Sequence, residues 1–195
     1  MRKLPTSLPN TYYLMRHGQS VANEQNIIVS LPEHGCDDAY GLSDVGCQQA
    51  VASAVASELS SDVLIYSSDF SRARQTAELA AAALKAATPI TTPALRERCF
   101  GELEFESAQY YQAVWQADSL GMQFGHGVET MTEVADRVER FIAHLGKVYC
   151  GRTILLVSHG DTLQAAQLAT RKLHPAIEYH KAMYMDNAEI KLLEC

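Results

Sequence analysis

Residues 12–18 have the sequence YYLMRHG, in which an apolar and aromatic run leads directly into Arg16, His17 and Gly18. The run does not alternate polar with apolar residues, which is typical of a strand buried on both faces of a sheet. Similar runs occur at residues 63–66 and 154–157. We therefore expect three buried strands, the first of which ends at the Arg-His-Gly tripeptide.

Helical patterns lie between the expected strands. Ser43 can cap a helix whose apolar residues would face the core. These inward-facing residues would be Val45, Val51, Ala54, Val55 and Leu59. The alanine-rich segment 71–85 and the aromatic segment 108–120 predict the next two helices.

The remaining elements complete an alternating order of strands and helices. Thr130 and Glu133 fit a capping box at the start of a helix, and residues 161–169 indicate another. Residues 188–193 are compatible with a last strand. This order favours an α/β fold, a three-layer α/β/α sandwich with a mostly parallel central sheet, formed as one domain by residues 1–195.

Composition narrows the class of protein. The chain has 195 residues, is 47% hydrophobic and 20% charged, and so resembles an ordinary soluble globular protein. Its net charge of −7 argues against a nucleic-acid partner, and no apolar run approaches the roughly 18 residues of a membrane span. The five cysteines are widely spaced and odd in number, which favours reduced thiols in a cytoplasmic protein over disulfides or a zinc ribbon.

Residues 22–41 have no clear period and contain Pro32, Gly35 and Gly41. A loop of this length in a compact domain is usually functional or mobile. It leaves the end of the first expected strand, so we expect it to rim the site.

Each expected strand leads into residues that can carry chemistry. The first ends in Arg16 and His17, the second leads to Arg72, and the third leads to His159. Ligands in open α/β sheets bind outside the carboxyl ends of the strands. Two arginines and two histidines from three distant stretches should therefore meet at one edge of the sheet.

This set of residues suits a phosphate group. Arginine presents a planar fork of donors that matches phosphate oxygens, and two arginines can neutralise most of the charge. The same cations disfavour an imidazolium, so His17 should stay neutral and nucleophilic. Gly18 and Gly160 would let the backbone approach a ligand closely, and Asn23 would add an amide donor.

Two competing interpretations use neighbouring or identical residues. Arg74 lies two positions from Arg72, but on a helix the two side chains point apart, so only one should face the pocket. A metal site could instead be built from His17, His159 and Asp161, although the adjacent arginines would repel a metal cation. We therefore expect no metal and no other cofactor.

These motifs resemble those of the histidine phosphatase superfamily, also called the phosphoglycerate mutase-like fold. The likeness covers most of the chain, and its blocks occur in the family's order. The resembling stretches are residues 14–20 together with Asn23, residues 41–50, residues 67–77 and residues 157–160.

The resemblance implies a phosphohistidine mechanism. His17 would attack phosphorus, while Arg16, Arg72 and His159 would stabilise the transferring phosphoryl group. Glu97, in a segment similar to the family's Glu-x-x-x-Gly stretch, would protonate the leaving oxygen and then activate water.

The choice of acid stays open between neighbouring carboxylates. Glu102 and Glu104 lie close to Glu97 in the sequence and would otherwise be surface charges. Where the family often has Glu-Gly, this chain has Glu104-Phe105, so the local path of the chain can differ.

Members of this fold include phosphatases and mutases. The stretch from Glu97 to His159 is too short for the basic insertion with which similar mutases clamp a second phosphate. We therefore expect a metal-independent phosphomonoester hydrolase acting on a small phosphorylated substrate. A phosphoglycerate mutase-type phosphotransferase and a catalytically silent phospholigand-binding protein are the alternatives.

Substrate identity and assembly are not encoded in these motifs. The segment 22–41 and the expected aromatic helix would meet the rest of the substrate, although such aromatic residues belong more often to a core than to a ligand site. These aromatic residues are Tyr110, Tyr111 and Trp115. The motifs do not determine the oligomeric state either, and a homodimer is compatible with the sequence.

Overall fold

A five-stranded sheet forms the centre of the computed structural model, which describes residues 8–175 and 178–194. The strand order is β3-β2-β4-β1-β5. The strands are β1 (Thr11–Arg16), β2 (Leu64–Ser67), β3 (Ile90–Thr91), β4 (Thr153–Ser158) and β5 (Ile190–Leu192). The first four pair in parallel, and β5 pairs antiparallel with β1. The sheet is therefore mixed and mostly parallel, as predicted.

The three central strands end side by side. Arg16 of β1 pairs with Ser158 of β4, and Ser67 of β2 pairs with Val157 of β4. Because these strands are parallel, the residues that follow each of them emerge at the same edge of the sheet.

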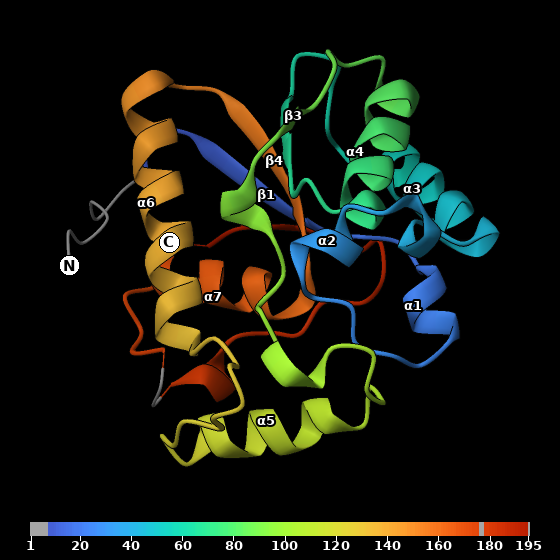
Figure 1. Ribbon diagram of the computed structural model, residues 1–195. Coiled ribbons are helices and arrows are strands. Elements are labelled where there is room, and N and C mark those ends of the chain that lie inside the picture. The colour runs from blue at the N-terminus through green and yellow to red at the C-terminus, as the bar shows by residue number, and fades with distance from the viewer. Residues whose placement is uncertain (1–7, 176–177, 195) are drawn as a thin grey trace.

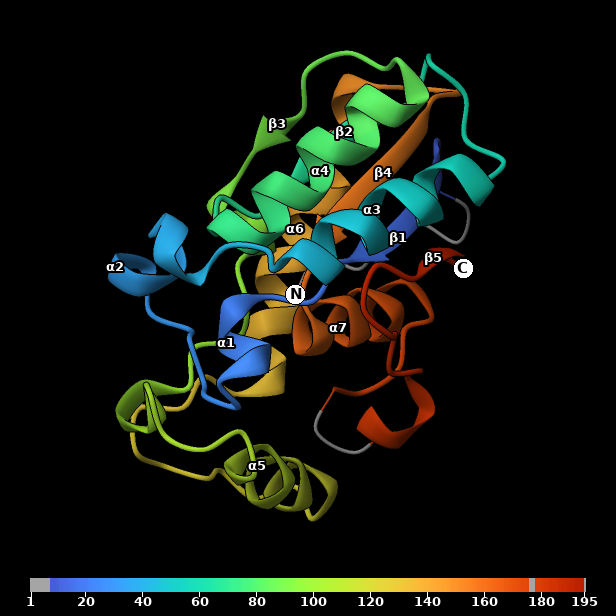
Figure 2. The same ribbon diagram turned by 90° about the vertical axis from the view of Figure 1, so that its right-hand side faces the viewer.

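Helices cover both faces of the sheet, which confirms the predicted three layers (Figures 1 and 2). The helices are α3 (Asp44–Ala56), α4 (Ser71–Leu84), α5 (Tyr110–Ser119), α6 (Met131–Val148) and α7 (Gly160–Thr170). Helices α3 and α4 pack on one face, and α6 and α7 pack on the other. Helix α5 stands apart from both layers, at the bottom of Figure 1.

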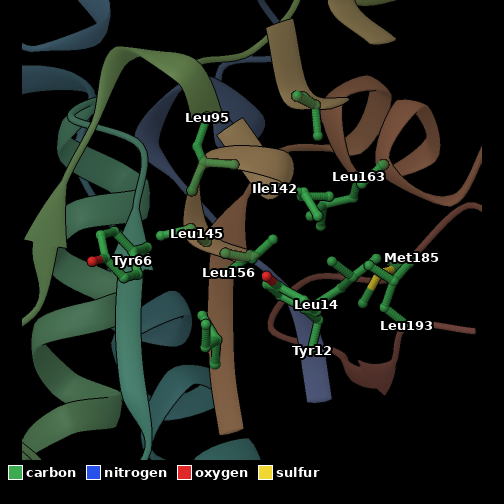
Figure 3. Packing of buried hydrophobic residues seen from close by; sticks show 13 residues of the cluster. Tyr12, Leu14, Tyr66, Leu95, Ile142, Leu145, Leu156, Leu163, Met185 and Leu193 are labelled. Carbon is green, nitrogen blue, oxygen red and sulfur yellow. The ribbon is translucent and has the colours of Figure 1, made fainter. Parts of the chain in front are cut away.

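The core between the sheet and α6 is made of large apolar side chains (Figure 3). Leu14 of β1 and Leu156 of β4 pack there with Ile142 and Leu145 of α6. Thr130 caps α6 with the predicted capping box. Both the helix and its buried face were therefore predictable from apolar spacing.

Helix α3 packs through its small residues, and the prediction that its valines face inward is wrong. The exposed fractions of Val45, Val51 and Val55 are 48%, 38% and 68%. The buried face consists of Gly46, Ala50 and Ala54. It packs with the alanine face of α4, so the two backbones approach closely and leave no room for a valine side chain.

The segment 22–41 is not an irregular loop but a series of very short helices. They are α1 (Val21–Glu24), α2 (Pro32–Gly35) and the 3-10 helix η1 (Asp38–Tyr40). Elements of three or four residues are too short to show a periodic pattern, which explains why the sequence did not predict them. Three further 3-10 helices lie elsewhere in the described residues: η2 (Pro93–Leu95), η3 (Gly101–Leu103) and η4 (Tyr179–Lys181).

None of the helices in the described ranges combines the length and apolar character that crossing a membrane requires.

Candidate active site

The ends of the three central strands bring four predicted residues together. Arg16 ends β1 and His17 follows it, Arg72 lies in the first turn of α4, and His159 is the N-cap of α7. The Arg72 Nε lies 3.3 Å from His17 Nε2, and the ring centroids of His17 and His159 are 5.1 Å apart. We call Arg16, His17, Arg72 and His159 the strand-end group.

The hydrogen bonds of His17 identify its tautomer. Nδ1 lies 2.7 Å from the carbonyl oxygen of Gly18. A carbonyl only accepts, so Nδ1 must carry the proton. Nε2 then has a free lone pair, and it accepts a hydrogen bond from Arg72 Nε. The unprotonated nitrogen is therefore the one beside the arginine.

Both histidines of the group are held neutral. Burial puts the pKa of His17 well below its usual value of 6.5, and the charges of Arg72 and Arg16 lower this pKa further. Burial is also the largest cause of the lowered pKa of His159, followed by Arg72 and His17. The sequence predicted the effect of the arginines but not the larger effect of burial.

The strand-end group holds several buried polar atoms without a partner among the described residues. They are Arg16 Nε, Arg72 Nη1 and both ring nitrogens of His159. Each arginine is anchored elsewhere, by Arg16 Nη1 donating to Met185 O at 2.9 Å and by Arg72 Nη2 donating to Val29 O at 3.0 Å. Leaving buried donors unpaired is costly, so their concentration at one place indicates a ligand that accepts hydrogen bonds.

Beside the group lies a small cavity of about 40 Å³. Arg16, His17 and Arg72 line it together with Glu97 and Gly160. His159 lies behind them, with its ring packed between His17 and Phe70.

The segment 22–41 rims this cavity, as predicted. It supplies Ala22, Asn23, Ile27 and Val29 to the lining. The Asn23 Oδ1 accepts hydrogen bonds from Ser20 N and Oγ, both at 3.0 Å, which fixes the amide at the start of α1.

Gly18 lies outside the cavity lining, and the structure gives it a role in packing. A Cβ at Gly18 would overlap the backbone of Gly46 in α3. Its N–H donates to Thr76 Oγ1 at 3.1 Å. The lack of a side chain thus makes room for α3, and the close approach of a ligand to Gly18 stays a prediction. At Gly160, which does line the cavity, a Cβ would lie 3.0 Å from the Tyr184 ring.

Arg74 points away from the cavity, as the helical geometry predicted. It pairs with Asp38 at 2.6 Å and with Glu78 at 3.1 Å on the surface. Arg72 is therefore the arginine of α4 that faces the site.

Glu97 lies in the wall of the cavity, in the segment between η2 and η3. Its Oε1 accepts hydrogen bonds from Arg98 N at 2.9 Å and from Thr162 N at 3.4 Å. These backbone donors, one of them in the first turn of α7, hold the Glu97 carboxylate in place in the cavity wall.

The neighbouring carboxylates behave differently from one another. The Glu102 side chain is 76% exposed, as a surface charge should be. Glu104 is not a surface charge, because only 8% of its side chain is exposed. Its Oε2 accepts from Ser30 N and Leu31 N, and its Oε1 pairs with His34 Nδ1 at 2.9 Å. Glu104 therefore fastens the segment that rims the cavity.

Three aromatic side chains also line the cavity. Tyr111 and Trp115 of α5 line it together with Tyr184, whereas Tyr110 is 44% exposed. Tyr111 and Trp115 are stacked, and Trp115 meets Tyr184 edge-on at 5.7 Å between ring centroids. We call Tyr111, Trp115 and Tyr184 the aromatic half. Tyr111 and Trp115 also pack against buried hydrophobic clusters, so they contribute to the core, as expected, and to the cavity lining as well. Tyr184 was not predicted at all.

Asp161 completes the lining beside the aromatic half. Its Oδ1 accepts from Trp115 Nε1 at 3.0 Å and its Oδ2 from Arg98 Nη1 at 3.3 Å. Arg98 also bonds both carboxylate oxygens of the buried Asp118. Burial and the negative charge of Glu97 raise the pKa of Asp161 to about 7.

These contacts bear on the metal interpretation. Each oxygen of Asp161 already accepts one hydrogen bond, Oδ1 from Trp115 and Oδ2 from Arg98. Over residues 8–175 and 178–194, no three or more His, Cys, Asp or Glu side chains are grouped so that they could hold a metal ion.

Comparison with known proteins gives a consistent family. The model of the histidine phosphatase superfamily (branch 1) matches residues 12–195. A metal-independent phosphoserine phosphatase from Arabidopsis thaliana is 29% identical over 166 residues, 80% of this chain but only 66% of that protein's length. A probable phosphoglycerate mutase GpmB from Yersinia pestis (strain Pestoides F) is 31% identical over 157 residues, 77% of this chain and 70% of the relative.

Solved structures agree on the fold. A mycobacterial glucosyl-3-phosphoglycerate phosphatase superposes with a TM-score of 0.74 at 25% identity, over 92% of this chain and 87% of that one. Bacillus stearothermophilus YhfR superposes with a TM-score of 0.78 at 23% identity, over 95% of this chain and 91% of that one.

Proposed function

Because this chain belongs to branch 1 of the histidine phosphatase superfamily, we propose that it is a metal-independent phosphomonoester hydrolase that forms a phosphohistidine on His17. One observation carries the proposal. Buried polar atoms of Arg16, Arg72 and His159 without a partner among the described residues belong to the same group of side chains as the unprotonated Nε2 of His17. The donors among them suit the oxygens of a phosphoryl group whose phosphorus faces that nitrogen.

The first chemical step is transfer to the histidine. The lone pair of His17 Nε2 attacks phosphorus, and the bond from phosphorus to the ester oxygen breaks. Arg16 and Arg72 stabilise the charge that spreads over the phosphoryl oxygens. Glu97, in the same cavity wall, gives its proton to the leaving oxygen.

The second step reverses the role of the acid. The ionised Glu97 takes a proton from water, and the water oxygen attacks phosphorus. The bond between phosphorus and nitrogen breaks, inorganic phosphate leaves, and His17 is again neutral.

The charges of the cavity favour hydrolysis over a mutase reaction. Among the described residues that line it, the only arginine or lysine side chains are Arg16 and Arg72, both in the strand-end group. A mutase must hold a second anionic group of its substrate, and this lining offers no further cation for one. The neutral nucleophile also argues against a silent phospholigand-binding protein.

The test is turnover of p-nitrophenyl phosphate in the presence of a chelator. We expect hydrolysis that survives chelation, together with an alkali-stable phosphoenzyme labelled on His17. Phosphate binding without turnover would instead support the silent binding protein. Activity that depends on added metal, or isomerisation of 3-phosphoglycerate faster than its hydrolysis, would contradict the proposal.

A further inference from the structure

The cavity lining carries charged groups of both signs. The strand-end group contributes the guanidinium groups of Arg16 and Arg72. Glu97 and Asp161 contribute carboxyl groups, and only 3% of the Asp161 side chain is exposed. Because the transferring phosphate engages the two arginines and Glu97 carries the proton for the leaving oxygen, Asp161 is the carboxyl group left to meet the rest of the substrate.

The aromatic half is arranged to accept a cation. The guanidinium of Arg16 already lies 4.8 Å from the centroid of the Tyr184 ring. The hydrogen bond from Trp115 Nε1 to Asp161 Oδ1 places this indole directly beside the carboxyl group. Aromatic rings next to a carboxylate form the usual environment for a bound ammonium group.

Anionic leaving groups lack a partner in the same place. A carboxylate or a second phosphate bound beside Trp115 would face the carboxyl group of Asp161, because the transferring phosphate already engages Arg16. Arg98 cannot provide a cation for such an anion. Its side chain is 2% exposed, and its donors are already directed to Asp118, Asp161 and the Glu129 carbonyl. Such groups would therefore be rejected by unpaired like charge.

We propose that the leaving group carries an ammonium group, so that the substrate is the phosphate monoester of a small amino alcohol. The phosphate binds the strand-end group, and the ammonium group binds between Asp161 and the rings of Trp115 and Tyr184. This inference rests on the proposed hydrolase function. It adds that a carboxylate on the same leaving group weakens the substrate.

The test is a series of four phosphate esters of primary alcohols that differ in charge. They are O-phosphoethanolamine, glycerol 3-phosphate, O-phosphoserine and 3-phosphoglycerate. We expect kcat/KM to be highest for phosphoethanolamine, about tenfold or more above the uncharged glycerol leaving group, and lowest for 3-phosphoglycerate. Phosphoserine should lie between phosphoethanolamine and 3-phosphoglycerate.

A matched pair of variants and a third substitution test which residues cause the preference for an ammonium group. Asp161→Asn removes the charge that faces the cavity, and it should lower the ratio of phosphoethanolamine to glycerol phosphate turnover by about tenfold. Asp118→Asn removes a charge from the same buried network but outside the cavity lining, and it should leave the ratio unchanged. Trp115→Leu keeps the carboxyl group and should lower the ratio by removing the ring, which covers the case in which Asp161→Asn does not fold.

The outcomes separate this inference from the function on which it rests. If glycerol phosphate or 3-phosphoglycerate is the best ester while His17→Ala still abolishes turnover, the ammonium proposal fails and the hydrolase stands. If Asp161→Asn and Trp115→Leu lower turnover of all four esters equally, the cation site is also refuted. If none of the esters is hydrolysed, both proposals fall.

Discussion

The two sides of the cavity differ in how they are attached to the fold. The strand-end group lies at the ends of β1 and β4 and, through Arg72, in the first turn of the helix that follows β2. These three strands form the buried middle of the sheet. The aromatic half comes from α5, which stands apart from both helical layers, and from Tyr184 in the segment before β5 (Figure 1). Under the proposed function, the reacting group and the leaving group are therefore held by different parts of the fold, so the residues around the leaving group can vary while the sheet stays the same.

The strongest way to break this comparison is to remove the centre of the strand-end group. His17→Ala should lower kcat by on the order of 10⁴-fold or more and abolish the phosphoenzyme, because no other group takes the nucleophile's place. Rapid quench with labelled substrate measures both quantities. His144→Ala, on the exposed side of α6, is the matched control and should behave as wild type. Normal turnover by His17→Ala would refute the mechanism.

The acid should come next in size. Glu97→Gln keeps the shape of the side chain but cannot donate a proton, so turnover of alkyl esters should fall by about 10²–10⁴-fold. p-Nitrophenyl phosphate needs less protonation of its leaving oxygen and should suffer less. Equal losses for the two kinds of ester would argue against Glu97 as the acid and direct attention to Asp161.

Loss of the planar guanidinium of Arg72 should lower activity somewhat less than loss of the acid. Arg72→Lys keeps the charge but cannot supply both the bond to His17 Nε2 and the bond to Val29 O. We expect kcat/KM to fall by about 10²–10³-fold. Arg74→Lys, two residues away on the outer face of α4, is the control for changes in helix stability and charge. A similar loss in both variants would show that α4, rather than the fork, is responsible.

A change in the aromatic half should sharpen the comparison by affecting recognition. Trp115→Phe removes the hydrogen bond to Asp161, which should raise KM for the preferred ester by about tenfold. Inhibition by inorganic phosphate reports on the strand-end group and should change much less. If the two constants rise together, the two sides are not independent.

The smallest expected effect concerns how the free energy of unfolding changes at acid pH. The two buried histidines of the strand-end group have lowered pKa values, so folding loses stability as pH falls below 6.5, where the unfolded histidines take up protons. Each contributes about 1.4 kcal/mol per pH unit until its own lowered pKa is reached. The raised pKa of Asp161 acts in the opposite direction, because the folded state takes up that proton first, near pH 7.

Substitution separates these opposing contributions. His17→Asn should lessen the loss of unfolding free energy below pH 6.5 by about 1.4 kcal/mol per pH unit relative to wild type. Urea unfolding at pH 7.5 and at pH 5.5 measures the difference. An unchanged pH dependence would mean that His17 is protonated in the folded protein.

The strand-end group could be predicted because each member follows an unbroken apolar run, and such runs have few structures available to them. The position of the aromatic half could not be predicted in the same way. The spacing of Tyr111 and Trp115 indicates that they share a helix face, but not whether this face meets a core or a cavity. Tyr184 lies in a segment without any periodic pattern, so only the folded chain brings it to the site.

Two other residues show where local patterns mislead. Val55 is apolar and sits at a helical spacing, yet the close approach of α3 and α4 leaves room only for small residues on the inner face. Glu104 is charged and lies near the exposed Glu102, yet donors from residues 30, 31 and 34 make a buried position favourable. In both cases the deciding partner is distant in the sequence.

The backbone hydrogen bonds of His17 determine when, during translation, this residue can reach its final position. Its N–H donates to Ser158 O at 2.9 Å, and its carbonyl oxygen accepts from Ala188 N and from Asn187 Nδ2, both at 3.1 Å. Asn187 is translated 170 residues after His17. During translation His17 therefore leaves the ribosome 170 residues before the side chain that holds its carbonyl oxygen. Under the proposed function, activity should appear only after residues 187 and 188 have been made.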